Sequence, residues 1–306
     1  MSEIIKDRSE ILFLYDIRDG NPNGDPMDEN KPRIDEETGV NIVTDVRLKR
    51  TIRDYLHDFK GQEIFVREII YDQENGYIQD GKRRAKDFEE KAERILNECI
   101  DVRLFGGVIP LTKDSITYTG PVQFKMGRSL HRVVMMHIKG TGAFASKEGS
   151  KQATFREEDF LPYSLISFYG IINENAAKHT RLTEDDANLL LEGIWNGTKS
   201  LISRSKVGQV PRLLLKVNYS KENYHIGDLD KMIKLVTDMP HENIRDTADY
   251  QIDISELIER LAADKDSIRD IELCADERIQ FCKDIAPFAI EGLEEITGIP
   301  VKPIAF

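Results

Sequence analysis

The order of strand-like and helix-like patterns limits the fold of this chain more than any other feature. Apolar, β-prone runs predict buried strands, and apolar residues three and four positions apart predict amphipathic helices. In chain order these patterns cover a strand at 11–15, a helix at 44–59, strands at 131–139 and 163–172, a helix at 183–201 and a strand at 212–219. This is the split βαβ order of ferredoxin-like and RRM-like folds. We therefore expect an α+β protein.

Two segments interrupt this order and predict parts that project from the core. Residues 60–130 form an insertion, with a charged helix pattern at 83–98 and a strand-like stretch at 115–124. Residues 140–155 are small, polar and rich in glycine. The strands on either side of them are therefore expected to pair as a hairpin with a long projecting tip.

The negative charge of the chain is concentrated at its C-terminal end. The 306 residues carry a net charge of −12, and residues 222–306 contribute −11 of it, with 20 acidic and 9 basic side chains. This region also contains a helix pattern near 254–262 and a strand pattern at 268–274. We interpret 222–306 as an acidic region that packs on, or extends, a core formed by residues 1–221.

Three stretches of the chain contain no aspartate or glutamate. Residues 46–53, 115–147 and 193–221 hold four, five and six lysines or arginines, respectively. Screening at physiological salt limits the reach of distant charges to about 8 Å, so local basic surfaces on an acidic protein can still attract a polyanion. Ordinary solvated basic faces explain the same pattern, and charge alone leaves both explanations open.

The first helix has the clearest basic pattern. Thr44 is a plausible N-cap, and one face of the helix is apolar, with Leu48, Ile52, Tyr55, Leu56 and Phe59. The bases that lie away from that face could follow phosphates or simply be solvated; they are Arg47, Lys49, Arg50 and Arg53. A second basic cluster, Arg204 and Lys206, is expected at the end of the second long helix, where bases also complement the helix dipole.

Motifs typical of enzymes and metal sites are missing from the sequence. It has no GxxxxGK[ST], HExxH or GxSxG motif, and its histidines lack metal-ligand spacing. The loop from Asp19 matches only the first half of a calcium-binding loop, because Asn30 stands at the twelfth position where glutamate is needed. Asp25 and Asp28 could support metal-assisted cleavage, but solvated loop acids explain them better. We expect no catalytic residues, metal or cofactor.

Composition favours a cytoplasmic protein. Three cysteines without a CxxC pair are too few for a disulfide framework, which fits a reducing compartment. No stretch approaches the roughly 20 apolar residues that a membrane span needs. At 40% hydrophobic residues and this length, the chain can bury a substantial core.

Several motifs together resemble a known family. They are Leu12-Phe-Leu-Tyr-Asp16, Gly20-Asn-Pro-Asn-Gly-Asp-Pro26, Pro32-Arg-Ile-Asp35 and Val43-Thr-Asp-Val-Arg-Leu-Lys-Arg50, supported by Arg103-Leu-Phe-Gly-Gly107, Gly120-Pro-Val-Gln-Phe124, Arg128-Ser129 and Thr183-Glu-Asp-Asp186. Over residues 10–220 the chain resembles the Cas-seven family of the RAMP superfamily. These are the CRISPR RNA-binding backbone subunits of Cascade, and the type I-B and I-C branches are the most similar.

The resemblance implies an architecture and a role. It implies an RRM-like palm within 1–221, with a finger at about 60–130 and a thumb hairpin at about 140–160. Copies would stack head to tail along the spacer of the CRISPR RNA, bind other Cascade subunits and present the guide to target DNA in antiviral defence. Cutting would be left to a separate recruited nuclease, so the chain itself would not be an enzyme.

The resemblance also implies RNA-binding residues. Lys49 and Arg53 would hold the guide phosphates, with Thr44 and Arg50 nearby and further contacts from the finger side. The basic patterns by themselves add Arg47 and the second basic cluster. The full candidate set is Thr44, Arg47, Lys49, Arg50, Arg53, Gln123, Arg128, Arg132, Arg204 and Lys206. This interpretation requires that Lys49 and Arg53 line an open channel and are not buried against carboxylates of the same copy.

An enzymatic alternative comes from the wider superfamily. Type III relatives cut target RNA with an acidic residue in the loop after the first strand. Asp25 lies in the corresponding loop and would be the candidate here.

Overall fold

A central sheet of nine strands organises the computed structural model, which describes residues 3–145 and 153–306. Its strands are β1 (Ser9–Gly20), β4 (Val40–Val43), β9 (Val122–Phe124), β10 (Gly127–Arg132), β11 (Met136–Ala145), β12 (Ala153–Ile172), β13 (Val210–Tyr219), β16 (Ile268–Ala275) and β19 (Val301–Pro303). The order is β19-β16-β13-β1-β12-β10-β4, with β9 and β11 also paired to β12. Neighbours are antiparallel except β16 and β19. The protein is therefore α+β, as its sequence predicts.

Strand β1 is buried on both faces of this sheet. Phe13 and Tyr15 pack into a hydrophobic cluster with the helices on one face, whereas Leu12 and Leu14 pack into a second cluster with the C-terminal region on the other. A strand covered on both sides carries apolar residues continuously instead of alternating them with polar ones. The apolar run that the sequence shows at 11–15 has this cause, and the strand extends beyond it in both directions.

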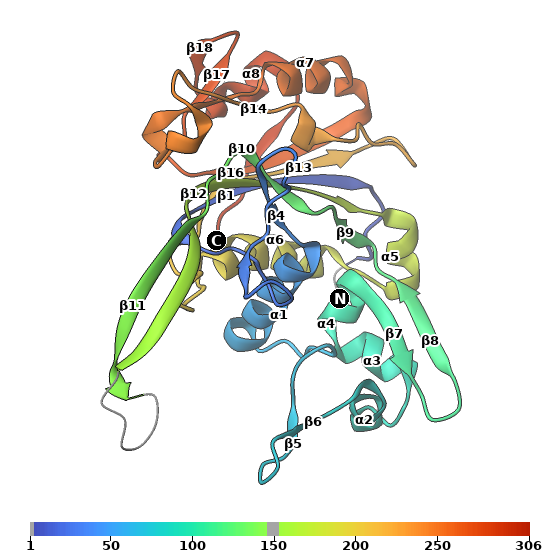
Figure 1. Cartoon of the computed structure of the whole chain (residues 1–306). Helices are drawn as coiled ribbons and strands as arrows, with labels where there is room; N and C mark the ends of the chain where they lie inside the picture. Colours follow the sequence, from blue (N-terminus) through green and yellow to red (C-terminus); the bar gives the residue numbers. More distant parts are fainter. Residues whose placement is uncertain (1–2, 146–152) are drawn as a thin grey trace.

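Two long helices, α1 (Asp45–Lys60) and α6 (Glu184–Lys199), cover the first face of the sheet (Figure 1). They pack closely because α6 carries glycines at the contact. A Cβ atom added at Gly193 would lie 3.0 Å from the Ile52 side chain, and one added at Gly197 would lie 3.0 Å from Tyr55 Cβ. Phe59 was expected on the buried face of α1 but is 64% exposed and stacks on Tyr55.

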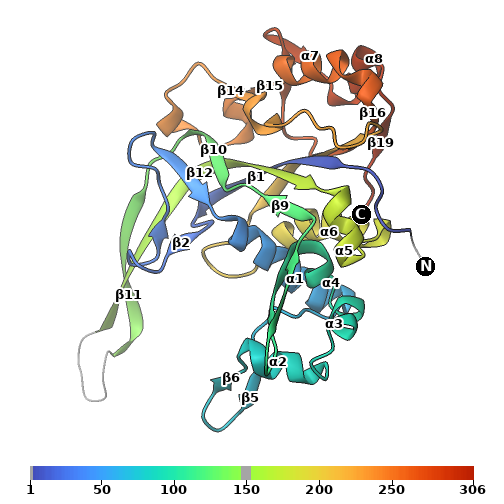
Figure 2. The ribbon, with the colours of Figure 1, turned by 90° about the vertical axis from the view of Figure 1, so that its right-hand side faces the viewer.

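The C-terminal region covers the opposite face of the sheet and also extends it (Figures 1 and 2). Strands β16 and β19 join the central sheet next to β13. The rest forms a four-stranded sheet, two α-helices and five short 3-10 helices: β14 (Lys234–Val236), β15 (Gln251–Asp253), β17 (Phe281–Lys283), β18 (Ala286–Phe288), α7 (Ser255–Ala263), α8 (Leu293–Thr297), η1 (Leu229–Lys231), η2 (His241–Asn243), η3 (Thr247–Asp249), η4 (Lys265–Ser267) and η5 (Ile290–Gly292).

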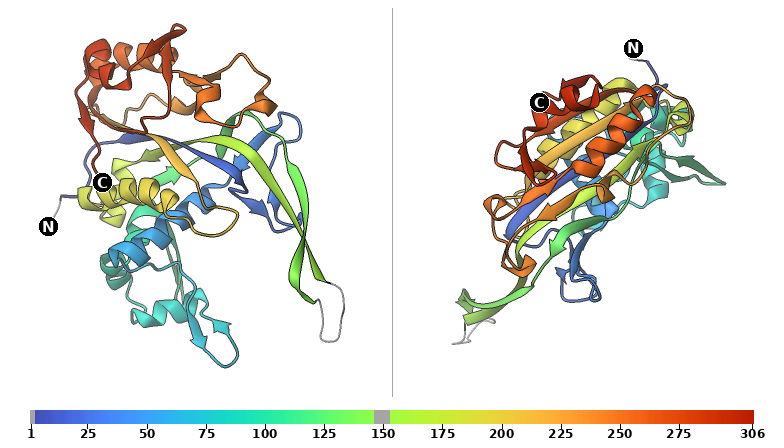
Figure 3. Two further views of the ribbon diagram at one scale, coloured as in Figure 1. Left: turned by 90° about the vertical axis from the view of Figure 1, so that its left-hand side faces the viewer. Right: turned by 90° about the horizontal axis from the view of Figure 1, so that it is seen from above.

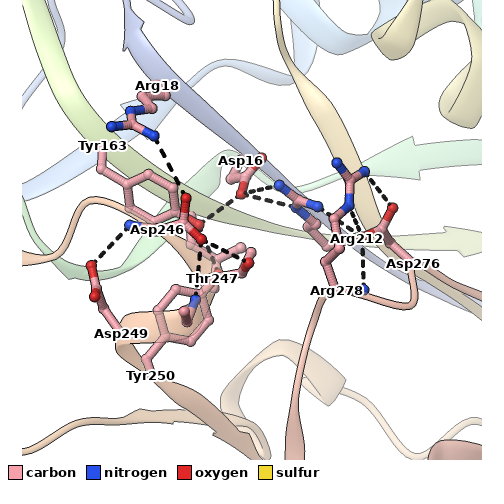
Figure 4. A network of polar contacts seen from close by, with 12 residues as sticks. Asp16, Arg18, Tyr163, Arg212, Asp246, Thr247, Asp249, Tyr250, Asp276 and Arg278 are labelled. Atoms are coloured by element: carbon pink, nitrogen blue, oxygen red, sulfur yellow. Dashed lines mark hydrogen bonds and ion pairs between the residues drawn. The ribbon is translucent and has the colours of Figure 1, made fainter.

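A buried polar network joins this region to the sheet (Figure 4). Asp16 on β1 accepts hydrogen bonds from the Tyr163 hydroxyl at 2.7 Å and from Arg212, whose guanidinium also pairs with Asp276 at 2.8 Å. The Tyr163 and Tyr250 hydroxyls lie 2.7 Å apart. Burial raises the pKa of Asp16 and of both tyrosines. Because these groups are paired with one another, the network fixes the C-terminal region on the sheet without leaving a buried charge uncompensated.

The segment between α1 and β9 forms a small body with its own hydrophobic cluster. We call it the finger segment; it contains β5 (Ile70–Asp72), β6 (Tyr77–Ile78), α2 (Gly81–Asp87), α3 (Ala92–Glu98), α4 (Ile100–Phe105), β7 (Gly106–Pro110) and β8 (Ser115–Thr119). The single helix expected at 83–98 is two helices, because Glu89 and Glu90 adopt positive φ angles between them. The strand expected at 115–124 is divided into β8 and β9. Since β9 and β10 belong to the central sheet, the insertion is shorter than 60–130.

Strands β11 and β12 extend beyond the sheet as a long antiparallel hairpin, with Met136 opposite Phe160. This confirms the predicted pairing around 140–155, although the strands begin and end at other residues: 131–139 is divided between β10 and β11, and β12 is far longer than 163–172. The predicted tip at 146–152 lies outside the described residues. The hairpin and the finger segment project on the same side of the sheet, away from the C-terminal region (Figures 2 and 3).

The remaining elements are β2 (Gly24–Asp25) and β3 (Lys31–Pro32), which pair within the loop after β1, and α5 (Glu174–Thr180), which precedes α6. Among the helices of the described ranges, none combines the length and apolar character that crossing a membrane would require.

Candidate nucleic-acid interface

The first turn of α1 is fixed to the loop that follows β1. Thr44 is the N-cap, and its hydroxyl oxygen accepts a hydrogen bond from the Arg47 backbone N–H at 3.3 Å. The backbone N–H and the hydroxyl of Thr44 both donate to Asn23 Oδ1 at 2.8 Å. The predicted N-cap is confirmed, and its side chain is fully used by the cap and the loop. Asn23 was not predicted; it orients the loop by accepting both bonds.

Lys49 and Arg53 are engaged by carboxylates of the same chain. Lys49 Nζ lies 3.1 Å from Asp45 Oδ2 and 3.0 Å from Gln123 Oε1, and its side chain is only 12% exposed. Arg53 Nε lies 3.0 Å from Asp101 Oδ2, and its side chain is 13% exposed. The requirement stated for these two residues is therefore not met, because neither presents a free cation on an open channel in this structure.

The finger segment explains why this face of α1 is not exposed to solvent. Asp101 on α4 is fully buried, and it also accepts hydrogen bonds from the backbone N–H groups of Phe65 at 2.7 Å and Val66 at 3.1 Å. The Phe105 ring lies beneath the Arg53 guanidinium, 5.0 Å from its centroid. Arg53 thus joins α1 to the base of the finger segment. Sequence periodicity places it opposite the apolar face of α1 but does not reveal this second packing surface.

The other arginine candidates are exposed but paired. Each guanidinium contacts one carboxylate, and each arginine side chain is more than half exposed. The pairs are Arg50–Asp54, Arg128–Asp35, Arg132–Glu242 and Arg204–Glu158. Exposed pairs of this kind contribute about 0–1 kcal/mol, so a phosphate can replace the carboxylate at little cost. Gln123, the remaining finger-side candidate, also donates to the Gly120 carbonyl at 3.0 Å.

Arg47 and Lys206 differ from all of these cations. Within residues 3–145 and 153–306, neither side chain makes an ion pair. Arg47 donates to the Thr51 hydroxyl at 3.1 Å, and Lys206 lies 3.4 Å from the Asn21 carbonyl and 3.3 Å from the Ser205 hydroxyl. Burial lowers the pKa of both groups, and the nearby charge of Arg47 lowers the pKa of Lys206 further. Two partly buried positive charges therefore lie together without an ion-paired carboxylate among the described residues, although the charge of Asp54 acts on Arg47 at longer range.

Both side chains line an open cavity of about 580 Å³ between α1 and the turn that follows α6. Phe59 and Ile202 also line it, and Ile202 is 91% exposed. The cavity includes Asp54 and Asp58 as well, so an anion is favoured at the Arg47–Lys206 end and not throughout. Cations beside exposed apolar side chains suit a ribose-phosphate strand, whose phosphates need charge and whose sugars and bases offer apolar surface.

The position of Lys206 corrects the sequence interpretation. Helix α6 ends at Lys199 with Ser200 as its C-cap, so Arg204 and Lys206 lie in a turn beyond the helix. Complementing the helix dipole, the simpler explanation from sequence, therefore does not account for them, because that effect is confined to the last turn of a helix. Lys206 instead reaches back to Asn21 in the loop after β1.

The acids of that loop are also paired. Asp25 Oδ2 lies 2.9 Å from Arg33 Nη1, and Asp25 Oδ1 accepts the Met27 backbone N–H at 3.0 Å. Asp28 lies 2.8 Å from Lys31 Nζ. In the part of the chain that the structure describes, no three histidine, cysteine or acidic side chains come together as metal ligands.

Comparisons with known proteins agree with this architecture. A family described as "CRISPR-associated protein Cas7" matches residues 7–255. A curated protein from Haloferax volcanii, also described as CRISPR-associated protein Cas7, is 34% identical over 303 residues, covering 89% of this chain and 88% of the relative.

Two solved structures share the fold. One, from a "CRISPR RNA-guided surveillance complex, pre-nicking", has a TM-score of 0.55 at 12% identity and covers 95% of this chain and 99% of its own. Another, from a "CRISPR RNA-guided surveillance complex", has a TM-score of 0.54 at 13% identity, with 88% and 89% covered. The family match over most of this chain, together with the 34% identical relative, establishes that the chain belongs to the CRISPR-associated protein Cas7 family.

Proposed function

We propose that this protein is an RNA-binding backbone subunit of a cytoplasmic type I Cascade surveillance complex. Membership of the Cas7 family supports this role. The observation that carries the binding site is the Arg47–Lys206 pair, two adjacent cations that line one cavity and form no ion pair within the described residues. A phosphate of the CRISPR RNA would supply the missing charge. Arg50, Arg128, Arg132 and Arg204 would add contacts by exchanging surface carboxylates for phosphates.

The proposed site suits a guide of any sequence. Phosphate contacts position a strand without reading its bases, so the subunit would hold the backbone while base pairing with target DNA reads the sequence. In this proposal Lys49, Arg53, Thr44 and Gln123 support the binding site indirectly. They fix α1 to the finger segment and to the loop after β1 and do not contact phosphates themselves.

The arrangement of the core supports the finer fold assignment that we propose. The order β13-β1-β12-β10, all antiparallel, with α1 and α6 on one face, is the order expected of an RRM-like palm. We assign the finger segment as the finger and the β11–β12 hairpin as the thumb. Their projection on one side of the palm would leave the guide between them.

We also propose that copies assemble head to tail along the guide, together with other Cascade subunits. A repeated heterologous contact builds an open filament, whose length the bound RNA would set. The acidic region, 222–306, would meet basic surface on the next copy and help to fix its register. Reversing acidic charges in this region should weaken RNA-driven assembly; unchanged assembly would contradict this part of the proposal.

Binding of guide-length RNA of unrelated sequences to the full chain tests the site. Arg47→Ala with Lys206→Ala should weaken all sequences equally and reduce the slope of log K against log salt by about 1.4, the value for two lost phosphate contacts. A control that removes two exposed charges from the acidic region, Lys231→Ala with Lys234→Ala, should leave the slope unchanged. A loss confined to particular sequences would contradict phosphate contact.

We propose that the chain is not itself an enzyme. The alternative, cleavage of target RNA by Asp25, gains nothing from the contacts of that carboxylate, which is paired with Arg33. Guide-loaded protein incubated with complementary RNA and Mg²⁺ distinguishes the two. Intact RNA is expected. Cleavage that Asp25→Ala abolishes would establish the alternative.

A further inference from the structure

The tip of the finger segment carries large side chains that no hydrophobic cluster absorbs. Strands β5 and β6 form a two-stranded hairpin that bears Ile70, Tyr71, Tyr77 and Ile78, each at least 42% exposed. None of the four belongs to the three hydrophobic clusters formed by the described residues. A lone two-stranded hairpin is only marginally stable in water. A hairpin that also exposes this much apolar surface is typical of a site that binds a partner.

Helix α2 places cations next to these rings. The Arg83 guanidinium lies over the Tyr71 ring, 3.6 Å from its centroid, and the Tyr71 and Tyr77 rings lie 6.3 Å apart. Lys82, Arg83 and Lys86 are exposed and, within the described ranges, form no ion pairs. Together with Tyr71 they line an open cavity of about 520 Å³.

Two acids near this cavity also hold the local backbone. Asp80 also lines it, but its carboxylate caps α2 by accepting the Arg83 backbone N–H at 2.8 Å. Asp72 accepts the backbone N–H groups of Glu74 and Asn75 and holds the hairpin turn. The residues that line the cavity therefore supply three cations and one carboxylate beside exposed aromatic faces, while Asp72 acts on Arg83 and Glu90 acts on Lys86 from outside the lining.

We propose that this basic-aromatic tip, formed by Tyr71, Tyr77, Lys82, Arg83 and Lys86, binds single-stranded DNA. Unpaired bases stack on aromatic and guanidinium faces while neighbouring cations contact the phosphates. A duplex would use the cations but not the rings, because its bases are already stacked. That the strand is DNA rests on the proposed function, in which pairing of the guide with one strand of a target leaves the other unpaired.

The tip is distinct from the Arg47–Lys206 site. Strands β5 and β6 lie at the far end of the finger segment (Figure 1), whereas Arg47 lies on α1 and Lys206 in the turn after α6. Because the two sites share no residue, the effects of substitutions at the two sites on nucleic-acid binding should add. This separation allows the tip to be tested independently of guide binding.

The test uses the full-length, guide-free chain and a fluorescent oligothymidylate of about 12 nucleotides, within the range of single-strand sites. Tyr71→Ala with Tyr77→Ala should weaken binding at least about tenfold through lost stacking, whereas replacing both tyrosines by phenylalanine should retain it. Lys82→Gln with Lys86→Gln should reduce the salt slope by about 1.4. A control pair of exposed lysines outside the tip, Lys113→Gln with Lys265→Gln, should do neither.

Each remaining outcome is decisive. Unchanged oligothymidylate binding in the double alanine variant would overturn the proposal, as would equal losses in the alanine and phenylalanine variants. Impaired self-association with intact DNA binding would also overturn it and identify the tip as a contact between copies. If Arg47→Ala with Lys206→Ala leaves RNA binding intact while the tip variants lose DNA binding, the proposed guide site fails and the tip stands.

Discussion

Replacing Arg53 by alanine distinguishes a structural joint from a phosphate ligand. Among the described residues, the substitution leaves the fully buried Asp101 carboxylate with only the Phe65 and Val66 backbone donors. Breaking a buried ion pair by removing one partner costs about 3–5 kcal/mol. The two remaining donors and the 13% exposure of Arg53 favour the lower end. Loss of the Phe105 contact adds about 0.5–1 kcal/mol. We expect a destabilisation of about 3–4 kcal/mol.

Urea unfolding followed by the fluorescence of Trp195 measures this loss. Trp195 is the single tryptophan, and it packs against the hydrophobic cluster that contains the buried face of α1. Arg50→Ala on the same helix is the control, because its exposed pair with Asp54 should contribute less than about 1 kcal/mol. Arg47→Ala with Lys206→Ala should unfold at the same or a higher urea concentration, because it removes two partly buried cations that repel each other.

The double-mutant cycle isolates the pair itself. Arg53→Ala, Asp101→Asn and the double variant should give a coupling energy of about 1–3 kcal/mol, as contacting residues do. A destabilisation below about 1 kcal/mol for Arg53→Ala, combined with loss of RNA binding, would refute the structural role and show that Arg53 contacts the guide RNA.

Three further predictions concern stability. Burial lowers the pKa of His131 to about 4, whereas its pKa in the unfolded chain is about 6.5. The unfolded chain therefore takes up this proton first as the pH falls, and the free energy of unfolding decreases by up to about 3 kcal/mol between pH 6.5 and pH 4. Urea titrations at several pH values should show this slope diminished in His131→Gln; an identical slope would contradict the assignment. Gly197→Val should lower stability by about 1–3 kcal/mol through overpacking against Tyr55, and an unchanged urea midpoint would contradict that contact. Glu10→Ala should cost at least about 3 kcal/mol, because it strands the Tyr169 and Tyr219 hydroxyls that bond its buried carboxylate; a loss below about 1 kcal/mol would show that water satisfies them.

Local sequence patterns predicted the helices and strands of the core, because caps and apolar periodicity are set by residues close together in the chain. The helix at 44–59 has an N-cap and an apolar face, and both hold in α1 except that Phe59 is exposed. The capping box at Thr183 begins α6 as expected. The finger segment was predicted less well, since its short elements depend on conformations at Glu89 and Glu90 that no periodicity encodes.

What the sequence determined by itself is the order of the core elements, the projecting hairpin and the family, because these depend on spacing and on contiguous motifs. Only the tertiary structure decided which cations are paired with carboxylates. Arg53 and Arg47 look alike on a helical projection, but α4 brings a buried carboxylate to one and the turn after α6 brings a second cation to the other. The charge that a side chain meets is set by segments distant in the chain, and helical spacing contains no information about them.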